Sequence, residues 1–150
     1  TTWTGLYEDL HRHPEWSFEE ERTAAIVADS LRTAGFEVET GVGRTGVVGV
    51  LRNGDGPTVL VRADMDALPV TERTGLPYTS AAEGVCHACG HDVHVTCLLA
   101  ACAELAATGD TWAGTLLAVF QPAEEVGAGA RAMLDDGLYE RYGTPVVVLP

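Results

Sequence analysis

Apolar, β-branched runs that alternate with segments of helical periodicity constrain the fold of this chain more than any other feature. Such runs predict strands at residues 47–51, 58–63, 115–120 and 146–149. The first two are joined by Asn53-Gly54-Asp55-Gly56-Pro57, which is typical of a β-hairpin. The alternation as a whole predicts an α/β layer structure, with a largely parallel sheet and one antiparallel excursion.

Two helices are predicted before the first strand. Apolar residues at helical spacing over residues 3–10 predict an amphipathic helix that stops near Pro14. Ser17 followed by Glu20 is typical of a capping box and should open a second helix. That helix carries its apolar residues on one side and should end at Gly35.

Two further helices are predicted in the second half of the chain. The longer one spans about residues 94–107 and should bury one stripe: Val95, Leu98, Leu99 and Cys102. A short helix around residues 131–136 should be closed by Gly137. Residues 65–93 show little periodicity, and a loop of that length inside one domain is usually functional.

The composition is that of an ordinary globular protein. A chain of 150 residues with 46% hydrophobic and 21% charged residues is one domain with a sizeable core. Nine basic and 22 acidic residues give a net charge of −13, which argues against nucleic acid or an anionic membrane as a partner. We find no run of 18 apolar residues and no charged-then-apolar leader, so we expect neither a spanning helix nor a signal peptide.

The four cysteines, Cys86, Cys89, Cys97 and Cys102, all lie within 17 residues. Disulfides with that distribution would hold a domain together poorly. Cys97 and Cys102 lie in an apolar helical stretch and are expected to be reduced core thiols. A cytoplasmic location is therefore expected.

The segment His87-Ala88-Cys89-Gly90-His91-Asp92, with His94 just beyond, concentrates groups that bind metals. Thiolate and neutral imidazole are preferred ligands of zinc and similar divalent ions. Cys89 and His91 are the candidate ligands, and Gly90 between them permits the irregular turn they require. Asp92 and His94 could orient the ligands or contact substrate, while His87 is left unassigned. The alternative is a reduced cysteine beside hydrogen-bonded histidines at a helix N-terminus.

Glu124 and Glu125 form a vicinal pair directly after the strand predicted at residues 115–120. Adjacent side chains at a strand end diverge, so one can bind a metal while its neighbour faces a water bound there. A metal lowers the pKa of such a water toward neutrality, and a free carboxylate can accept the proton and return it to a leaving group. Two solvated glutamates in a loop are the alternative, which Pro122 and the buried strand before the pair disfavour.

Asp64 and Asp66 lie at the end of the strand predicted at residues 58–63 and alternate, so they should share a face. They could hold a ligand histidine by hydrogen bonding, or only close the strand through backbone bonds, with Arg62 as a charge partner. Sites in open α/β sheets form outside the carboxyl ends of strands. The aspartates, the cysteine-histidine segment and the glutamate pair should therefore open onto one edge of the sheet.

Four motifs in order resemble one enzyme family: LHRHPE (10–15), RADMDALP (62–69), HACGHDVH (87–94) and FQPAEE (120–125). They are similar to the hippurate hydrolase and N-acyl-amino-acid amidohydrolase branch of the zinc aminoacylase–carboxypeptidase family, whose relatives include the plant auxin-conjugate hydrolases. The resemblance covers essentially the whole chain. It implies a three-layer α/β/α fold with a mostly parallel, mixed central sheet, as in zinc exopeptidases.

The resemblance also implies an activity and its residues. The expected reaction is metal-dependent hydrolysis of the amide bond of a small N-acyl amino acid, with two divalent ions (zinc, manganese, cobalt or nickel). Carried over by motif, Cys89 is a bridging thiolate ligand, and His91 and Glu125 are further ligands. Glu124 is the general base, and Asp66 supports the site.

Length is where the chain departs from the family pattern. Family members are much longer; a small lid and dimerisation domain interrupts their catalytic domain, and two further ligand histidines follow. The resemblance therefore implies that residues 1–150 are the N-terminal part of a catalytic domain, with three of five ligands. We expect weak metal binding without the remainder, an exposed apolar last strand, and a full-length homodimer or larger oligomer. Cys86 stands where methionine is usual.

Three rival interpretations stay open from the sequence. Cys86 and Cys89 form a C-x-x-C ahead of a helix, which is typical of thiol redox proteins. Cys86, Cys89, His91 and His94 could together form a structural zinc module, although four donors within nine residues would strain a tetrahedral site. The chain could also be a non-catalytic remnant that only binds acyl-amino acids or a partner chain.

Overall fold

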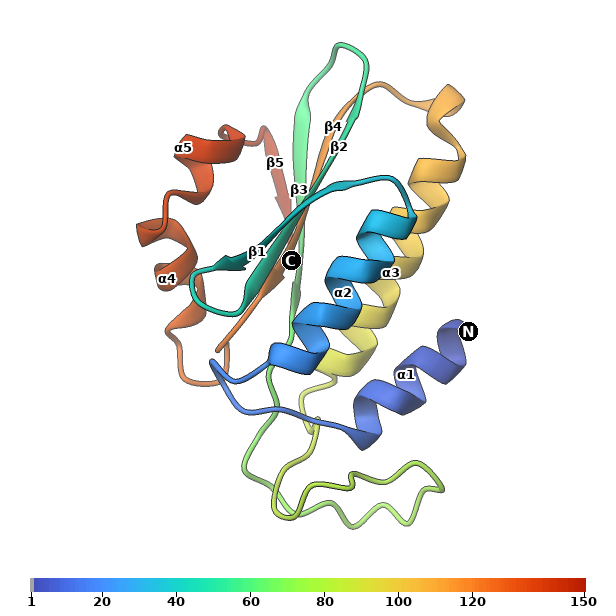
Figure 1. Ribbon diagram of the computed structural model, residues 1–150, viewed down its shortest axis with the longest axis vertical. Helices are drawn as coiled ribbons and strands as arrows, with labels where there is room; N and C mark the ends of the chain where they lie inside the picture. The colour runs from blue at the N-terminus through green and yellow to red at the C-terminus, as the bar shows by residue number, and fades with distance from the viewer. Residues whose placement is uncertain (1) are drawn as a thin grey trace.

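A five-stranded sheet separates two helical layers in the computed structural model, which describes residues 2–150 (Figure 1). The strands are β1 (Glu37–Val42), β2 (Gly46–Asn53), β3 (Thr58–Asp64), β4 (Gly114–Gln121) and β5 (Val147–Leu149). The helices are α1 (Trp3–Arg12), α2 (Glu21–Thr33), α3 (His91–Ala107), α4 (Gly129–Asp135) and α5 (Leu138–Tyr142), with one 3₁₀ turn at Gly109–Thr111. The helices α1, α2 and α3 cover one face of the sheet, and α4 and α5 lie on the other. The predicted α/β/α layers are confirmed.

The sheet is mixed, as predicted, with the strand order β1-β2-β4-β3-β5, but the expected parallel majority is wrong, since the described residues form two parallel and two antiparallel strand pairs. Strand β3 pairs in parallel with β4 and β5, whereas β1–β2 and β2–β4 are antiparallel. Strand β1 was not predicted from the sequence, because its EVETGV run lies at the edge of the sheet and carries few apolar residues.

The predicted hairpin between β2 and β3 is wrong, because β4 lies between them. Leu117 at the middle of β4 is paired with Val50 of β2 on one side and with Leu60 of β3 on the other. The connection at residues 53–57 instead passes close to the start of β4, where a Cβ on Gly56 would lie 2.8 Å from the carbonyl oxygen of Ala113. The turn residues indicated a chain reversal correctly, but they carry no information about which strand fills the gap.

Two apolar cores flank the sheet because side chains alternate along each strand. On β4, Leu116, Ala118 and Phe120 pack toward α1, α2 and α3. Leu117 and Val119 pack toward α4 and α5 on the other face. The stripe predicted on α3 is confirmed, since Val95, Leu98, Leu99 and Cys102 are all buried. Cys97 lies outside this stripe and is exposed, so its prediction as a core thiol is wrong.

The capping box predicted for α2 is also wrong. This helix begins at Glu21, and the side chain of its N-cap residue, Glu20, makes no capping hydrogen bond. Glu15 takes that role from outside the helix, since its carboxylate accepts hydrogen bonds from the backbone N–H groups of Arg22 (2.8 Å) and Thr23 (2.7 Å). The side chains of Ser17 and Glu20 are engaged by distant segments instead.

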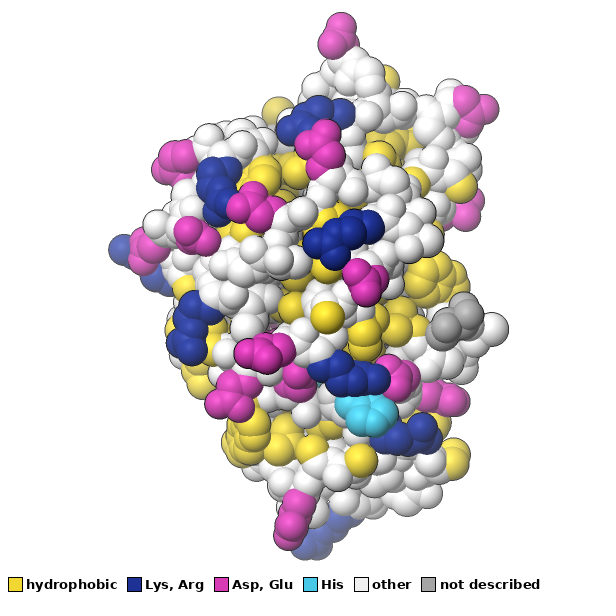
Figure 2. Space-filling model, viewed as in Figure 1, with side chains coloured by type: hydrophobic (Ala, Val, Ile, Leu, Met, Phe, Trp, Pro, Cys, Tyr) yellow, Lys and Arg dark blue, Asp and Glu magenta, His cyan; other side chains and the backbone are white. Residues whose placement is uncertain are grey.

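The surface shows one feature that the sequence predicted, the exposed apolar last strand. Acidic and basic side chains are mixed over the face seen in Figure 2, and neither kind gathers into one patch there. Along β5 and just before it, Val146, Val147, Val148 and Leu149 are 44–68% exposed, so this strand presents apolar surface. Within residues 2–150 no helix has the length and apolar character needed to span a membrane.

The central strand should dominate stability. Leu117 is fully buried, so we expect Leu117→Ala to lower the free energy of unfolding by about 2–5 kcal/mol through lost burial and the cavity left behind. Leu134→Ala on α4, where the side chain is 43% exposed, should cost less than about 1 kcal/mol. Urea unfolding of the two variants checks this, and equal losses would contradict the central position of β4.

Candidate metal site

Three segments distant in sequence meet at the carboxyl ends of β3 and β4. The two strands are parallel neighbours, with Asp64 paired with Gln121, so they end at the same level. Asp66 follows β3, the glutamate pair follows β4, and His91 opens α3 beside them. The predicted convergence at one edge of the sheet is therefore confirmed.

One group of potential ligands comprises the residues predicted to bind metal. Donor atoms of Cys89, His91 and Glu125 all lie within 4.8 Å of one another. The Nε2 atom of His91 is 3.9 Å from Glu125 Oε1 and 3.8 Å from Glu124 Oε2. Gly90 makes the turn between the thiol and the imidazole with a φ of 78°, a left-handed conformation that costs glycine little.

The orientation of His91 is fixed from behind by Asp66. The Nδ1–H group donates to the Asp66 carbonyl oxygen at 2.8 Å, and Nδ1 lies 3.3 Å from the Asp66 carboxylate. Only Nε2 is therefore left to face the glutamates. Burial lowers the pKa of His91, but the hydrogen bonds to Asp66 and the nearby carboxylates outweigh it and raise that pKa to about 9. The carboxylates that raise this pKa favour positive charge beside Nε2, and a metal cation would supply that charge in place of the proton.

Asp66 is the most heavily bonded side chain of the site. Its Oδ1 accepts from the backbone N–H of Glu124 (3.1 Å), and its Oδ2 accepts from the N–H of Glu125 (3.0 Å) and the hydroxyl of Ser17 (2.6 Å). Burial raises the pKa of Asp66, yet the hydrogen bonds from His91, Ser17 and the two backbone groups lower it to about 2. Of the two interpretations left open by the sequence, the structure shows the one in which an aspartate holds the histidine.

Asp64 belongs to a second group of potential ligands, formed with His91 and His94. Its Oδ2 lies 3.1 Å from Arg62 Nη2, as expected for a charge partner. Burial, the largest influence, raises the pKa of Asp64. Because His91 Nδ1 is engaged by Asp66, this histidine has one nitrogen to offer, and the two groups cannot both use it for separate ions.

Two buried carboxylate oxygens support a cation at this edge. Asp64 Oδ1 and Glu125 Oε1 are buried and have no hydrogen-bond partner among residues 2–150. Buried polar atoms are nearly always paired, so such an exception calls for an ion or water. Thiolate, imidazole and carboxylate together are also the donor set that zinc and similar divalent ions prefer. The residues therefore fit a divalent metal.

Asp92 was expected to orient the metal ligands or to contact substrate, but its carboxylate is hydrogen-bonded to groups outside the ligand set. Its Oδ2 is 2.6 Å from His11 Nδ1, and its Oδ1 accepts from the N–H of Val93 in its own helix. His11 Nε2 in turn contacts Glu72 Oε1 at 3.2 Å. Asp92 thus ties the start of α3 to α1 and to the long loop. The role of His11 was missed because only its position in LHRHPE marks it, and its partners lie 61 and 81 residues away.

His87, left unassigned from the sequence, is buried, and both of its ring nitrogens lack a hydrogen-bond partner among residues 2–150. Burial lowers the pKa of His87, and the carboxylates of Asp92 and Asp66 raise it by less. We assign it no role in the site.

The geometry disfavours two of the rival interpretations. A redox thiol needs a lowered pKa, but hydrogen bonding to Glu125, burial and the surrounding carboxylates raise the pKa of Cys89 to about 11. Burial likewise raises the pKa of Cys86. The four donors of a structural zinc module do not gather in residues 2–150, since Cys86 belongs to neither group of ligands. All four cysteines are free thiols. The cytoplasmic location expected from the sequence stays a prediction.

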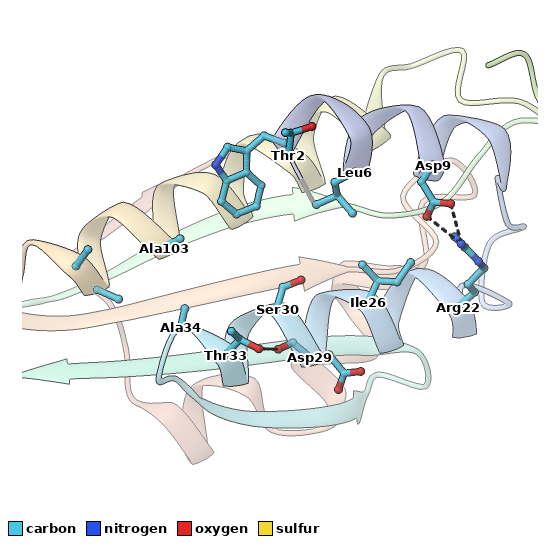
Figure 3. A pocket seen from close by; sticks show the side chains of 13 residues that line it. Thr2, Leu6, Asp9, Arg22, Ile26, Asp29, Ser30, Thr33, Ala34 and Ala103 are labelled. Carbon is cyan, nitrogen blue, oxygen red and sulfur yellow. Dashed lines mark hydrogen bonds and ion pairs between the residues drawn. The ribbon is translucent and has the colours of Figure 1, made fainter. Parts of the chain in front are cut away.

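A cavity of about 620 Å³ adjoins the site on the side of Glu125. Its walls are mostly apolar, formed by Trp16, Ala67, Leu68, Pro69 and Val126, and its charged groups are Glu19 and Glu125. A larger cavity, of about 1010 Å³, lies between α1, α2 and α3 (Figure 3). No histidine or cysteine lines the larger cavity, and its Arg22 is paired with Asp9 at 2.8 Å. We therefore place the chemistry at the smaller one.

Comparison with known proteins agrees with this geometry. The model of peptidase family M20/M25/M40 matches residues 60–148, which include both aspartates, the cysteine-histidine segment and the glutamate pair. The chain belongs to this family. The M20 assignment confirms the resemblance inferred from the four motifs.

Curated relatives are similar over most of the chain. Hippurate hydrolase of Campylobacter jejuni is 49% identical over 95% of this chain and 37% of its own length. N-acetyl-L-cysteine deacetylase of Bacillus subtilis is 42% identical, over 89% of this chain and 32% of its own length. The chain thus spans about a third of the curated M20 relatives it matches.

A solved M20 structure shares the fold. The YXEP protein of Bacillus subtilis, described as a dinuclear metal-binding peptidase, superposes with a TM-score of 0.86 and 38% identity. The match covers 91% of this chain and 39% of that one. The α/β fold with a mixed sheet is therefore that of M20 catalytic domains.

Removing a predicted ligand should weaken metal binding. We expect Glu125→Gln and Cys89→Ser each to lower the affinity for zinc or cobalt by about 100-fold or more, since losing a mere partner of a metal ligand already costs about 10–100-fold. Equilibrium titration with a chelator as competitor measures the affinity.

Two variants serve as controls for this prediction. Cys86→Ser and Glu124→Gln should keep the affinity within about threefold, because neither residue belongs to the Cys89–His91–Glu125 group. If Glu125→Gln binds metal as well as the unmodified chain while Cys86→Ser does not, a structural zinc site would be the correct interpretation.

Proposed function

We propose that this protein is a metal-dependent M20 amidohydrolase that cleaves N-acyl amino acids. The observation that carries the proposal is the arrangement around His91 Nε2, which Glu124 and Glu125 both approach within 4 Å while Cys89 completes the group of ligands. The names of the relatives support it, since hippurate hydrolase and N-acetyl-L-cysteine deacetylase act on N-acyl amino acids.

The two glutamates take different roles because they differ in accessibility. The side chain of Glu125 is 14% exposed and that of Glu124 is 42% exposed. We assign Glu125 to metal binding with Cys89 and His91, because its buried Oε1 atom has no hydrogen-bond partner among residues 2–150 and a cation would compensate its burial. Glu124 keeps contact with solvent and can reach a substrate, so we assign it to proton transfer.

Bound divalent ions would supply a water of lowered pKa and would polarise the substrate carbonyl. Glu124 accepts a proton as the water oxygen bonds to the carbonyl carbon. It then donates that proton to the amide nitrogen as the C–N bond breaks, so a carboxylic acid and a free amino acid leave. Asp66 holds His91 and the two glutamate N–H groups in place throughout.

We assign the acyl group of the substrate to the cavity of about 620 Å³ beside Glu125. Trp16, Leu68, Pro69 and Val126 give it apolar walls. No basic side chain lines this cavity, and its charged groups are both acidic. It therefore suits a neutral apolar acyl group and repels the carboxylate of the amino acid, which must be bound elsewhere.

We further propose that the residues described are the N-terminal part of the catalytic domain. The remaining metal ligands, a lid and dimerisation domain, and an oligomeric assembly would come from the rest of the length seen in the relatives. A non-catalytic protein that only binds acyl-amino acids is the second candidate, because the apolar cavity beside Glu125 would hold an acyl group whether or not the amide is cleaved.

The role of Glu124 can be tested in the full-length protein. We expect Glu124→Gln to lower kcat for amine release from an N-acyl amino acid by about 10²–10⁴-fold, because the amide cannot accept a proton. Metal content, measured by elemental analysis, should stay unchanged. Full metal content without amine release from any N-acyl amino acid in the unmodified protein would support the binding protein instead.

The assignment of the acyl cavity predicts a change in substrate preference. We expect Trp16→Ala to lower kcat/KM for N-benzoylglycine by about tenfold, since the aromatic ring loses apolar contact. The value for N-acetylglycine, whose methyl group is too small to reach Trp16, should change less than about twofold. An equal loss on both substrates would show that Trp16 does not contact the acyl group.

A further inference from the structure

We propose that Glu20 is a positioning residue that fixes the Glu124–Glu125 pair by holding the backbone of Ala123. This role rests on the proposed function, because it matters only if the pair handles metal and substrate. Glu20 lies at the end of the turn between α1 and α2, and it is 103 positions from Ala123 in sequence. Neither the reaction step nor the groups of potential ligands include it.

Glu20 is a fully buried carboxylate whose oxygens bind other segments. Its Oε1 accepts from the N–H groups of Phe18 (2.9 Å) and Ala123 (2.8 Å), and its Oε2 accepts from the hydroxyl of Thr45. It makes no side-chain cap for the helix that it precedes. Burying a carboxylate is costly unless its hydrogen bonds are satisfied, and here the segment after β4 supplies one of the donors.

The residue that Glu20 holds is in a strained conformation. Ala123 has a φ of 49°, a left-handed value that is unfavourable for a residue with a Cβ. Its N–H is held by Glu20, and its carbonyl oxygen accepts from the N–H groups of Ala128 (3.2 Å) and Gly129 (3.1 Å). Such strain persists only where the surroundings enforce it, and Glu20 supplies the enforcing contact on the N–H side.

The consequence of this conformation is seen in the next two residues. After the left-handed turn at Ala123, the N–H groups of Glu124 and Glu125 both reach the Asp66 carboxylate. Their side chains then lie beside His91 Nε2. Without the acceptor at Glu20, a buried N–H would be unsatisfied, and Ala123 could relax to a negative φ that turns both groups away from Asp66.

The test measures metal affinity in the full-length protein, with cobalt as the probe. We expect Glu20→Ala to weaken cobalt affinity by about tenfold or more, as for loss of a hydrogen bond to a charged group, and to lower kcat more than it raises KM. Glu20→Gln keeps an acceptor for both N–H groups and a donor for Thr45, so it should stay within about threefold. Metal affinity is measured without substrate. Absence of amide hydrolysis would therefore contradict the proposed function but would not affect this test.

Glu15→Ala is the matched control, because Glu15 also binds two backbone N–H groups of this region, those of Arg22 and Thr23. Both belong to α2, so the variant should destabilise the fold and leave cobalt affinity within about twofold. An equal loss of affinity in Glu15→Ala and Glu20→Ala would overturn the proposal, since it would show a general structural effect. Unchanged affinity in a folded Glu20→Ala would overturn it too.

Ala123→Gly tests the route of the effect. Glycine adopts a left-handed φ without strain, so removing Glu20 in an Ala123→Gly background should weaken cobalt affinity less than in the natural sequence. An effect of the same size in both backgrounds would contradict the route through Ala123. Should Glu20→Ala fail to fold, Glu20→Asp replaces it: the shorter side chain keeps the charge but withdraws the acceptor, and undiminished cobalt affinity would again overturn the proposal.

Discussion

The carboxylate of Asp66 is the constraint on which the candidate site depends. It accepts hydrogen bonds from Ser17, Glu124 and Glu125, and it lies 3.3 Å from His91 Nδ1. These partners come from the turn before α2, the segment after β4 and the start of α3. A buried carboxylate satisfied from three directions is rigid, so each partner segment is held relative to the others. Rigid placement of this kind is what metal and proton chemistry requires.

The position of Asp66 follows in turn from the sheet. Because β4 is apolar on both faces, it occupies the centre of the sheet and pairs with both β2 and β3. Its parallel pairing with β3 brings the two strand ends to one level, so the residues after each can meet. The same pairing that builds the core thus builds the site.

The sequence predicted features that depend on residues near one another in the chain. Most of the elements, the apolar stripe of α3 and the cysteine-histidine segment are local patterns and were predicted, whereas the edge strand β1 and the short helix α5 were not. What failed depended on partners far away: the strand that separates β2 from β3, the use of Ser17 and Glu20, and the engagement of Asp92 by His11. Ser17 and Glu20 have the residue types and the spacing of a capping box. Only the folded chain shows that an acceptor 49 positions away and a donor 103 positions away take their side chains instead.

The balance of charge explains why such a site needs a cation to be complete. Asp64, Asp66, Glu124 and Glu125 gather around His91, and Arg62 is engaged with Asp64 and Gln121. One imidazolium cannot neutralise four carboxylates, and two of their buried oxygens have no partner among residues 2–150. A divalent ion held by Cys89, His91 and Glu125 would relieve this repulsion. Because the ion binds the folded chain and not the separated segments, its binding energy would add to the stability of the fold.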